Sequence, residues 1–309
     1  MNKRRAIGGF VLSFVFLALF IYSIAGVQWI FENSVQSQLD RAFLGSIKDS
    51  AKKDATEIVV ENVVKPNPAP EIFAGSAVSV ESNLKDAQKV IFEKSADVKL
   101  PIASLTKLMT AVIVLDNYNL SDIISVSKAA DSQDSIKQDV KLGDTMPVGD
   151  FFEIMLIGSS NKSAYVLSEK LGTEKFVGLM NEKAKNIGLN NTFFADPTGL
   201  SAQNVSTAND LARLAEYILK NYPRIADISK VQELFLSNFG NVTNTDQLLG
   251  EIPDIVCSKT GFTTQAKGCL LLVVNNPKNN GYLINVVLGA DDRFSEMRKI
   301  INWSSEICK

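Results

Sequence analysis

The chain of 309 residues contains no histidine. Without an imidazole, Ser-His-Asp triads, Cys-His proteases and zinc hydrolases with histidine ligands are excluded. A hydrolase built from this sequence must take its general base from lysine, aspartate, glutamate or tyrosine. An excess of positive charge is also lacking, because the net charge is −2 and the pI is about 5.5. We therefore expect no nucleic-acid partner.

Cysteine is scarce, with residues at positions 257, 269 and 308 only. Three is an odd number and too few for a disulfide framework, and no Cys-x-x-Cys spacing indicates a metal site. We expect Cys257, Cys269 and Cys308 to be small buried apolar side chains. One disulfide with a third thiol left free is the alternative for an exported domain.

The first 31 residues predict a membrane segment. Residues 1–5 carry a basic cluster, and residues 6–31 are uncharged. At 1.5 Å per residue, 6–31 is long enough to cross a hydrocarbon core of about 30 Å. The positive-inside rule leaves 1–5 in the cytoplasm and the rest of the chain outside the cell membrane. A cleaved signal peptide is the alternative, because Ser23-Ile24-Ala25 offers small residues before Gly26.

The sequence predicts a stalk at residues 32–70 and the catalytic domain at residues 71–309. The stalk is polar and ends in alternating prolines from Lys65 to Pro70, which favour an extended spacer. Short apolar runs in the domain predict strands at 75–81, 89–93, 254–260, 269–275 and 282–289. Helical periodicity predicts helices at 104–117, 148–157, 162–171 and 211–219, and a closing helix from Phe294 to Ile307.

Strands at both ends of the domain with helices between them predict an α+β architecture. The simplest arrangement is one antiparallel sheet, with terminal helices on one face and a helical block beside it. Ser206 and Thr207 are candidate caps of the helix at 211–219.

With histidine absent, a serine activated by a lysine is the natural nucleophile. On a helix, residues three apart share one face, so Ser-x-x-Lys places an amine beside a hydroxyl. The pattern occurs at Ser50/Lys53, Ser82/Lys85, Ser104/Lys107, Ser125/Lys128 and Ser159/Lys162. Only Ser104/Lys107 opens a strongly apolar helix, where burial lowers the pKa of a lysine toward that of a working base. Read alone, the two residues are better explained as a helix cap and a solvated surface lysine.

Two further elements accompany this pair. Ser159-Ser160-Asn161 links two predicted helices, where a hydroxyl and an amide can project into a cleft. Lys259-Thr260-Gly261 closes a predicted strand, where a lysine and a hydroxyl can bind a carboxylate and glycine allows close approach of a ligand. Each alone could be ordinary loop or turn polarity.

In this order the three elements are those of penicillin-binding proteins and related β-lactamases. The chain resembles the low-molecular-mass penicillin-binding proteins, the serine-type D-alanyl-D-alanine carboxypeptidases, from about Gly75 to its end. The similar stretches are 101–111, 191–200, 206–210, 244–249 and 259–263. Ser160 stands where the family usually has glycine or asparagine. Many members have a further β-rich domain and a C-terminal membrane helix. This chain ends about fifty residues after Lys259, so we expect its attachment to be N-terminal.

The resemblance implies a penicillin-binding/β-lactamase-like transpeptidase fold, with a helical subdomain beside the antiparallel sheet, and an acyl-transfer mechanism. Ser104 would be the nucleophile and Lys107 its base, while Ser159 would pass a proton to the leaving amine. The remaining site residues would bind substrate: Asn161 the peptide backbone, Lys259 and Thr260 the terminal carboxylate, Gly261 by close approach, and the Phe262 amide, with that of Ser104, the oxyanion. No metal or organic cofactor is implied.

The substrates implied are peptidoglycan stem peptides ending in D-Ala-D-Ala, with β-lactam antibiotics as covalent inhibitors. A β-lactamase is one alternative, but class A members have Glu-x-x-Leu-Asn. Here Asn186 takes the place of that glutamate before Leu189 and Asn190. An endopeptidase that cuts cross-links shares the same motifs. An inactive scaffold is the alternative of another class, although it would be expected to lose Ser104, Lys107 or Lys259.

Overall fold

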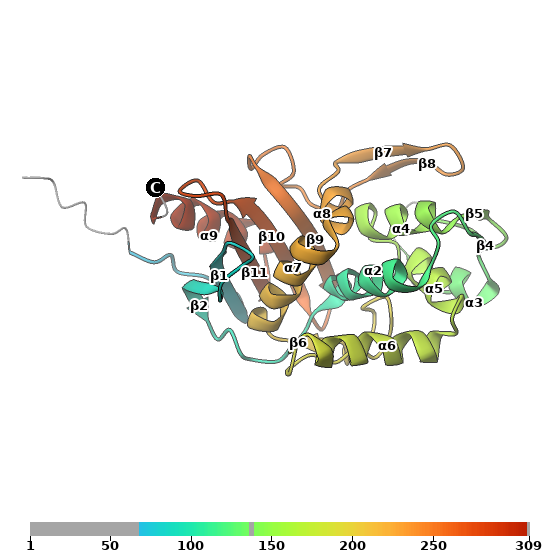
Figure 1. Ribbon diagram of the computed structural model, residues 1–309, viewed down its shortest axis with the longest axis horizontal. Coiled ribbons are helices and arrows are strands. Elements are labelled where there is room, and N and C mark those ends of the chain that lie inside the picture. The colour runs from blue at the N-terminus through green and yellow to red at the C-terminus, as the bar shows by residue number, and fades with distance from the viewer. Residues whose placement is uncertain (1–67, 136–138, 308–309) are drawn as a thin grey trace, which may run out of the picture. The chain divides into compact units, whose positions relative to one another are not determined.

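The computed structural model describes residues 68–135 and 139–307 (Figure 1). The predicted membrane segment 6–31, nearly all of the predicted stalk, the Ser50/Lys53 pair and Cys308 lie outside the described residues. Within them, no helix combines the length and the apolar character needed to cross a bilayer. Contacts group Pro66–Lys309 into one compact unit.

The centre of this unit is a five-stranded antiparallel sheet in the order β2-β1-β11-β10-β9 (Figure 1). Its strands are β1 (Ser76–Ser82), β2 (Lys89–Lys94), β9 (Ile255–Thr263), β10 (Lys267–Asn275) and β11 (Tyr282–Ala290). Strands from both ends of the domain meet here, because β1 pairs with β11. The predicted antiparallel sheet and the hairpin of β1 with β2 are confirmed.

Both faces of the sheet are buried, which explains the uninterrupted apolar run of β10. Leu270 and Leu272 pack in the cluster beneath α9 (Arg293–Ile307), whereas Leu271 and Val273 belong to the larger core on the other face. There α7 (Ala208–Asn221) packs against β1 and β11. Helices therefore cover both faces of the sheet, not one face as the sequence analysis expected.

The helical block lies beside the sheet (Figure 1). Its helices are α2 (Thr106–Asn117), α3 (Lys128–Asp131), α4 (Val148–Ile157), α5 (Asn161–Glu169), α6 (Thr173–Asn186) and α8 (Pro223–Ser229). Three short antiparallel pairs accompany them: β3 (Leu100–Pro101) with β6 (Val205–Ser206), β4 (Ile123–Ser125) with β5 (Thr145–Pro147), and β7 (Glu233–Leu236) with β8 (Gly240–Thr243). Every residue of α2 from Thr106 to Val114 is buried, so neighbours hold this helix on all sides.

Some local predictions are confirmed and others differ from the structure. The helix predicted at 148–157 is confirmed. Of the two candidate caps, Thr207 caps α7 by accepting a hydrogen bond from the Asp210 amide, whereas Ser206 belongs to β6. The helix predicted from Ser104 begins instead with a 3₁₀ turn, η1 (Ala103–Leu105). The sequence analysis did not predict α6. That helix buries only Phe176, Met180 and Ala184, a stripe too narrow to stand out from the sequence.

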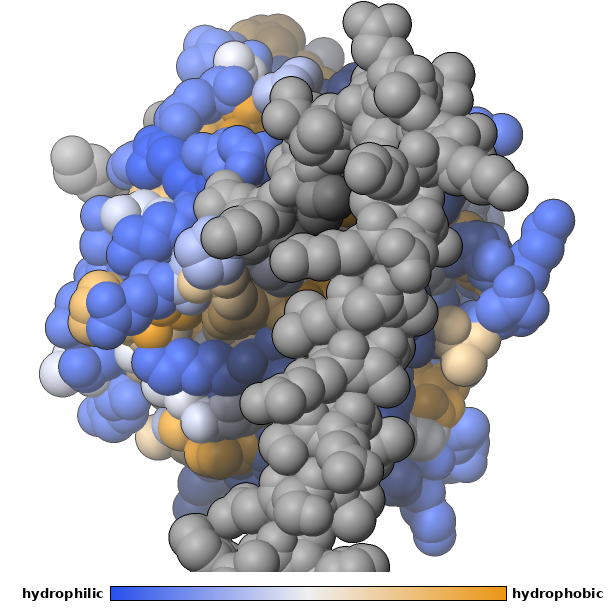
Figure 2. Space-filling view, turned by 90° about the vertical axis from the view of Figure 1, so that its left-hand side faces the viewer, coloured by the Kyte–Doolittle hydropathy of each residue, from blue (hydrophilic) through white to orange (hydrophobic). Residues whose placement is uncertain are grey.

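The two cysteines within the described residues, Cys257 and Cys269, are free and buried. Burial raises the pKa of both thiols to about 11, so they stay uncharged near neutral pH. They are the small buried side chains that the sequence predicted. On the outside, hydrophilic side chains predominate among the described residues visible in Figure 2, with smaller apolar areas between them.

Candidate active site

Ser104 and Lys107 face each other where η1 passes into α2. The Lys107 Nζ donates to the Ser104 Oγ at 2.9 Å, and the lysine side chain is completely buried. Within the described residues, no other Ser-x-x-Lys pair is hydrogen bonded in this way: Ser82 bonds to Glu216, Ser125 to Thr145, and Ser159 to Lys259. The choice made from helix context is thus supported by geometry.

The backbone around Ser104 is tightly enclosed. Ala103, just before it, adopts a left-handed φ of 46°, a conformation that L-residues other than glycine rarely adopt. A Cβ added at Gly199 would lie 2.0 Å from the Ala103 carbonyl oxygen, and one at Gly261 would lie 3.0 Å from the Ser104 nitrogen. Two glycines therefore let a loop and strand β9 close on the nucleophile from different directions.

The Lys107 amine has three hydrogen-bond acceptors. Besides Ser104, it donates to the Asn161 Oδ1 at 2.7 Å and to the Thr198 carbonyl at 2.5 Å. An ammonium fills all three positions, whereas a neutral amine has two N–H groups and one lone pair. The two carbonyl oxygens can only accept, so they hold the N–H groups and leave the lone pair facing the Ser104 hydroxyl.

Burial lowers the pKa of Lys107 from 10.5 to about 7. Two carboxylates, Asp196 and Asp139, oppose the shift because their negative charge stabilises the ammonium form. A lysine with this pKa exists as both acid and base near neutral pH, as a general base requires.

The loop from Asp196 to Gly199 positions the Thr198 carbonyl. The Asp196 carboxylate accepts from the amides of Thr198, Gly199 and Ser201 at 2.6–2.7 Å. Thr110 of α2 donates to the Pro197 carbonyl at 2.7 Å and ties the loop to the nucleophile's helix. This stretch is one of those similar to the family in sequence, but the similarity indicated no role for it. The atom that contacts Lys107 is a backbone carbonyl, which no residue type signals.

The Ser159–Asn161 turn brings a second serine beside a second lysine. Ser159 has a left-handed φ of 60°, and its Oγ accepts from the Lys259 Nζ at 2.8 Å. Asn161 is anchored at both ends of its amide, because its Nδ2 donates to the Asp134 carbonyl at 2.7 Å. The structure therefore gathers residues from α2, this turn and β9 into one cluster.

Lys259 lies almost fully buried on β9. Burial, reinforced by the positive charges of Lys107 and Arg293, lowers the pKa of Lys259 well below 10.5, while Asp246 opposes the shift. A carboxylate placed beside Lys259 would raise the pKa again, because an opposite charge stabilises the ammonium. The site thus favours binding of an anion at this point.

Thr260 and Phe262 face the outer part of the site. The Thr260 hydroxyl lies 2.5 Å from that of Thr245, a partner that the sequence analysis did not single out. Phe262 is 64% exposed. It lines a pocket of about 360 Å³ together with Asp134, Ser135, Asn161, Leu200, Thr263, Thr264 and Gln265. This pocket adjoins the cluster through Asn161 and can hold an extended ligand.

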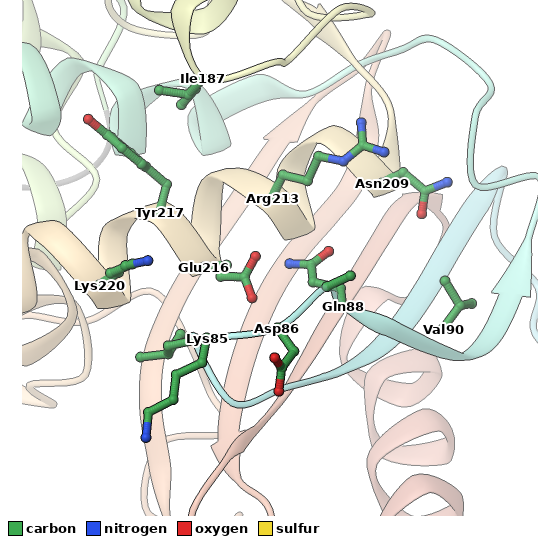
Figure 3. A pocket seen from close by; sticks show the side chains of 12 residues that line it. Lys85, Asp86, Gln88, Val90, Ile187, Asn209, Arg213, Glu216, Tyr217 and Lys220 are labelled. Carbon is green, nitrogen blue, oxygen red and sulfur yellow. The ribbon is translucent and has the colours of Figure 1, made fainter.

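A larger pocket, of about 540 Å³, lies between the β1–β2 turn and α7 (Figure 3). Charged side chains of both signs line it, among them Lys85, Arg213 and Glu216. None of the predicted site residues belongs to it, so size alone does not locate the chemistry.

Arg293 and Asp139 are charged groups of the site that the sequence analysis missed. Arg293, at the start of α9, is partly buried, and its Nε has no hydrogen-bond partner among the described residues. Asp139 accepts from the Ser160 hydroxyl at 2.5 Å. Both lie far in sequence from the residues they act on, and neither belongs to a recognisable motif.

The chain that carries this cluster is similar in sequence to known proteins. The sequence profile of the D-alanyl-D-alanine carboxypeptidases of peptidase family S11 matches residues 62–292. The chain is 35% identical over 247 residues to the D-alanyl-D-alanine endopeptidase of Escherichia coli (strain K12), covering 76% of this chain and 78% of that protein. It is 31% identical over 246 residues to the D-alanyl-D-alanine carboxypeptidase DacF of Bacillus subtilis (strain 168), covering 75% of this chain and 62% of DacF.

Solved structures of known proteins are also similar to this chain. The cefotaxime-bound form of penicillin-binding protein D2 from Listeria monocytogenes matches with a TM-score of 0.69 and 26% identity. The match covers 77% of this chain and 99% of that chain.

Proposed function

The chain belongs to the D-alanyl-D-alanine carboxypeptidases of peptidase family S11, and on that premise we propose that it trims peptidoglycan stem peptides through a Ser104 acyl-enzyme. The family resemblance and the α+β penicillin-binding fold predicted from the sequence are confirmed for the catalytic domain. The enzyme is a serine-type D-Ala-D-Ala peptidase. The observation that carries the proposal is the Lys107–Ser104 contact of 2.9 Å beside the Lys259–Ser159 contact of 2.8 Å.

In the first step, neutral Lys107 takes the proton from Ser104 as the Oγ attacks the carbonyl carbon of the scissile bond. The Asn161 and Thr198 oxygens, at 2.7 and 2.5 Å from the amine, keep its lone pair directed at the hydroxyl. The backbone amides of Ser104 and Phe262 stabilise the oxyanion. The close approach of Gly261 to the Ser104 amide supports this assignment.

In the second step, the bond to the terminal D-alanine breaks, and the proton that Lys107 took from Ser104 is relayed through the Ser159 hydroxyl to the departing amine, so that Lys107 is neutral again and Ser159 keeps a proton. Lys259 and Thr260 hold the carboxylate of that residue, and Asn161 holds the peptide backbone. Water then attacks the acyl-enzyme and releases the shortened peptide. No metal or organic cofactor takes part in these steps.

Endopeptidase activity on cross-links is the second candidate. It is favoured by 35% identity to the Escherichia coli endopeptidase, of which the chain covers 78%. The two activities need the same acyl-enzyme and differ in the leaving amine. A carboxylate beside that amine satisfies Lys259 and Thr260 whether the leaving group is free D-alanine or a cross-linked residue.

The test compares three peptide substrates and a penicillin with the purified protein. We expect release of D-alanine from a pentapeptide ending in D-Ala-D-Ala, and turnover at least about tenfold slower when its carboxylate is amidated, because charge-assisted hydrogen bonds are lost. Faster cleavage of cross-linked dimers than of pentapeptide would make the enzyme an endopeptidase. Rapid penicillin hydrolysis without D-alanine release would make it a β-lactamase, and no covalent labelling would indicate an inactive scaffold.

Penicillins are the inhibitors that this site should accept. The Listeria monocytogenes relative has been solved in ampicillin-bound and cefotaxime-bound forms. We expect a fluorescent penicillin to acylate Ser104 and to leave slowly, since Asn186 stands where class A β-lactamases carry the deacylating glutamate.

We also propose that residues 6–31 anchor the catalytic domain outside the cell membrane. The basic cluster before the segment and the uncharged length of the segment support this. Fractionation should find the full-length protein in membranes and resistant to salt extraction. A soluble product beginning at Gly26 would show a cleaved signal peptide instead.

A further inference from the structure

The carboxylate of Asp139 lies behind the Ser159–Asn161 turn and has no step in the mechanism above. Its Oδ1 accepts from the Ser160 hydroxyl at 2.5 Å and from the Val140 amide at 2.8 Å. Its Oδ2 is buried and has no hydrogen-bond partner among the described residues. A buried polar atom without a partner is destabilising. Stability alone therefore does not explain the presence of a carboxylate here.

The hydroxyl of Ser160 connects Asp139 to the turn. It accepts from the Ser163 amide at 2.9 Å, which caps α5, and it donates its proton to Asp139. Both contacts together fix the rotation of this hydroxyl. The neighbour on one side is Ser159 with its left-handed φ of 60°, and on the other side Asn161 accepts from Lys107. Fixing the position of Ser160 therefore also fixes Ser159 and Asn161, the two residues of the turn that contact Lys259 and Lys107.

The charge of Asp139 also reaches Lys107. Asp196 and Asp139 are the two carboxylates that act on Lys107, and Lys259 on β9 is the cation near it. On its other side Asp139 faces Lys162 of α5, which already pairs with Asp131 at 2.7 Å. Burial raises the pKa of Asp139, while the Ser160 hydrogen bond and the two lysines oppose that shift.

We propose that Asp139 is a positioning residue with two separable actions: through Ser160 it holds the Ser159–Asn161 turn in its reactive geometry, and its negative charge tunes the base Lys107. The inference rests on the proposed function, because both actions are exerted on the acylation machinery. The connection to Asp139 is made by the hydroxyl of Ser160, the middle residue of the turn.

The charge is tested with Asp139→Asn, measured as the rate of acylation by a fluorescent penicillin across pH. The amide can still accept from Ser160, so the turn stays in place and the plateau rate stays within about twofold of wild type. Without the negative charge the ammonium of Lys107 is less stable. The pH of half-maximal acylation should therefore fall by about half a unit. An unchanged midpoint would overturn the electrostatic action.

The hydrogen bond is tested with Ser160→Ala and Ser160→Thr. Alanine removes the contact to Asp139, and we expect a loss of about tenfold in the plateau acylation rate because the turn is no longer held. Threonine keeps the hydroxyl and should restore most of the rate. If alanine lowers the melting temperature but leaves the plateau rate unchanged, the contact is merely structural and the positioning action is refuted.

Asp131→Asn is the matched control, because it removes a carboxylate that pairs with Lys162 but does not bond to the turn. Its midpoint and plateau should match wild type. A shift equal to that of Asp139→Asn would mean that any nearby charge suffices, which contradicts the proposal. The wild-type protein separates this inference from its premise. Failure of wild type to be acylated would overturn both, whereas normal wild-type acylation with unaltered variants would overturn the inference alone.

Discussion

The helical block and the sheet each contribute one buried lysine hydrogen bonded to one serine. In the helical block, Lys107 and Ser104 are three residues apart, and the amine also meets two neutral carbonyl oxygens. From the sheet, Lys259 reaches Ser159, a hundred positions away in the sequence. The charged neighbours differ as well: Asp196 and Asp139 act on Lys107, whereas the cations Lys107 and Arg293 act on Lys259.

A lysine side chain is thus suited to a different chemical role in each of the two surroundings. Neutral acceptors around Lys107 direct a lone pair at a hydroxyl, which suits proton transfer. Burial, together with the positive charges of Lys107 and Arg293, makes the ammonium form of Lys259 costly until an anion arrives, which suits binding of a substrate carboxylate. The surroundings of each lysine, and not the residue type, distinguish the proposed base Lys107 from Lys259, the proposed ligand of the substrate carboxylate.

The largest expected effect is that of Ser104→Ala, because it removes the nucleophile that both lysines serve. Covalent labelling by a fluorescent penicillin should disappear, and the melting temperature should stay within a few degrees of wild type, since Ser104 is only half-buried and the change removes a single oxygen atom. Labelling that persists, or a labelled peptide that contains Ser159, would show that the two serines have been assigned the wrong way round.

Arginine at each lysine position separates the two roles next. Lys107→Arg should lower the acylation rate by about 10²–10⁴, the range of general base catalysis, because a guanidinium cannot be deprotonated near neutral pH. Lys259→Arg keeps the charge and should lose only about tenfold, from crowding in a packed site. Equal losses from the two variants would refute the division of roles.

The pH dependence should differ between substrates with and without a terminal carboxylate. Acylation needs Lys107 without its proton, so the rate should fall about tenfold per pH unit below the pKa of about 7 and rise to a plateau above it. The pentapeptide also needs Lys259 with its proton, so its kcat/KM should fall again as the pH rises through the lowered pKa of Lys259 in the free enzyme. The amidated peptide should lack that second decline. Identical profiles for both peptides would exclude Lys259 as the carboxylate ligand.

The smallest effect concerns Thr245, which supports the ligand side of the site only. Thr245→Val removes the hydroxyl 2.5 Å from that of Thr260. A lost hydrogen bond of about 1 kcal/mol predicts a KM raised about fivefold with kcat nearly unchanged. Thr245→Ser should behave like wild type. A fall in kcat without a change in KM would mean that Thr245 acts on the chemical step instead.

Local features of the site were predictable and distant ones were not. Ser104 and Lys107 share one helical turn, so spacing and an apolar context were enough to select them. Pairing of Lys259 with Ser159 required the sheet to be placed against the helical block, and the sequence supplied only motifs in the right order. The Thr198 carbonyl left no signal at all, because a backbone atom has no residue type. The Asp139 contact escaped for a different reason: Asp139 belongs to no family motif, so nothing in the sequence linked it to Ser160, 21 positions away.

The elements of the fold were likewise predictable in part from the sequence. Apolar runs located β10 and β11, because both of their faces are buried. Alternation located the more exposed edge strand β2. The helix α6 escaped prediction, since only Phe176, Met180 and Ala184 mark its buried side. The 3₁₀ turn that carries Ser104 also escaped, because its first residue, Ala103, adopts a left-handed φ that an alanine rarely adopts, enclosed by the loop at Gly199 and strand β9.

Gly199 and Gly261 bear on how such an enzyme could evolve resistance to penicillin. Even a methyl group at Gly199 would overlap the Ala103 carbonyl, and one at Gly261 would press on the Ser104 amide. Substitutions here cannot narrow the site against the drug without displacing the nucleophile from its own substrate. The wall that contains the exposed Phe262 and its neighbours in the outer pocket is less constrained, because side chains there can change without moving Ser104.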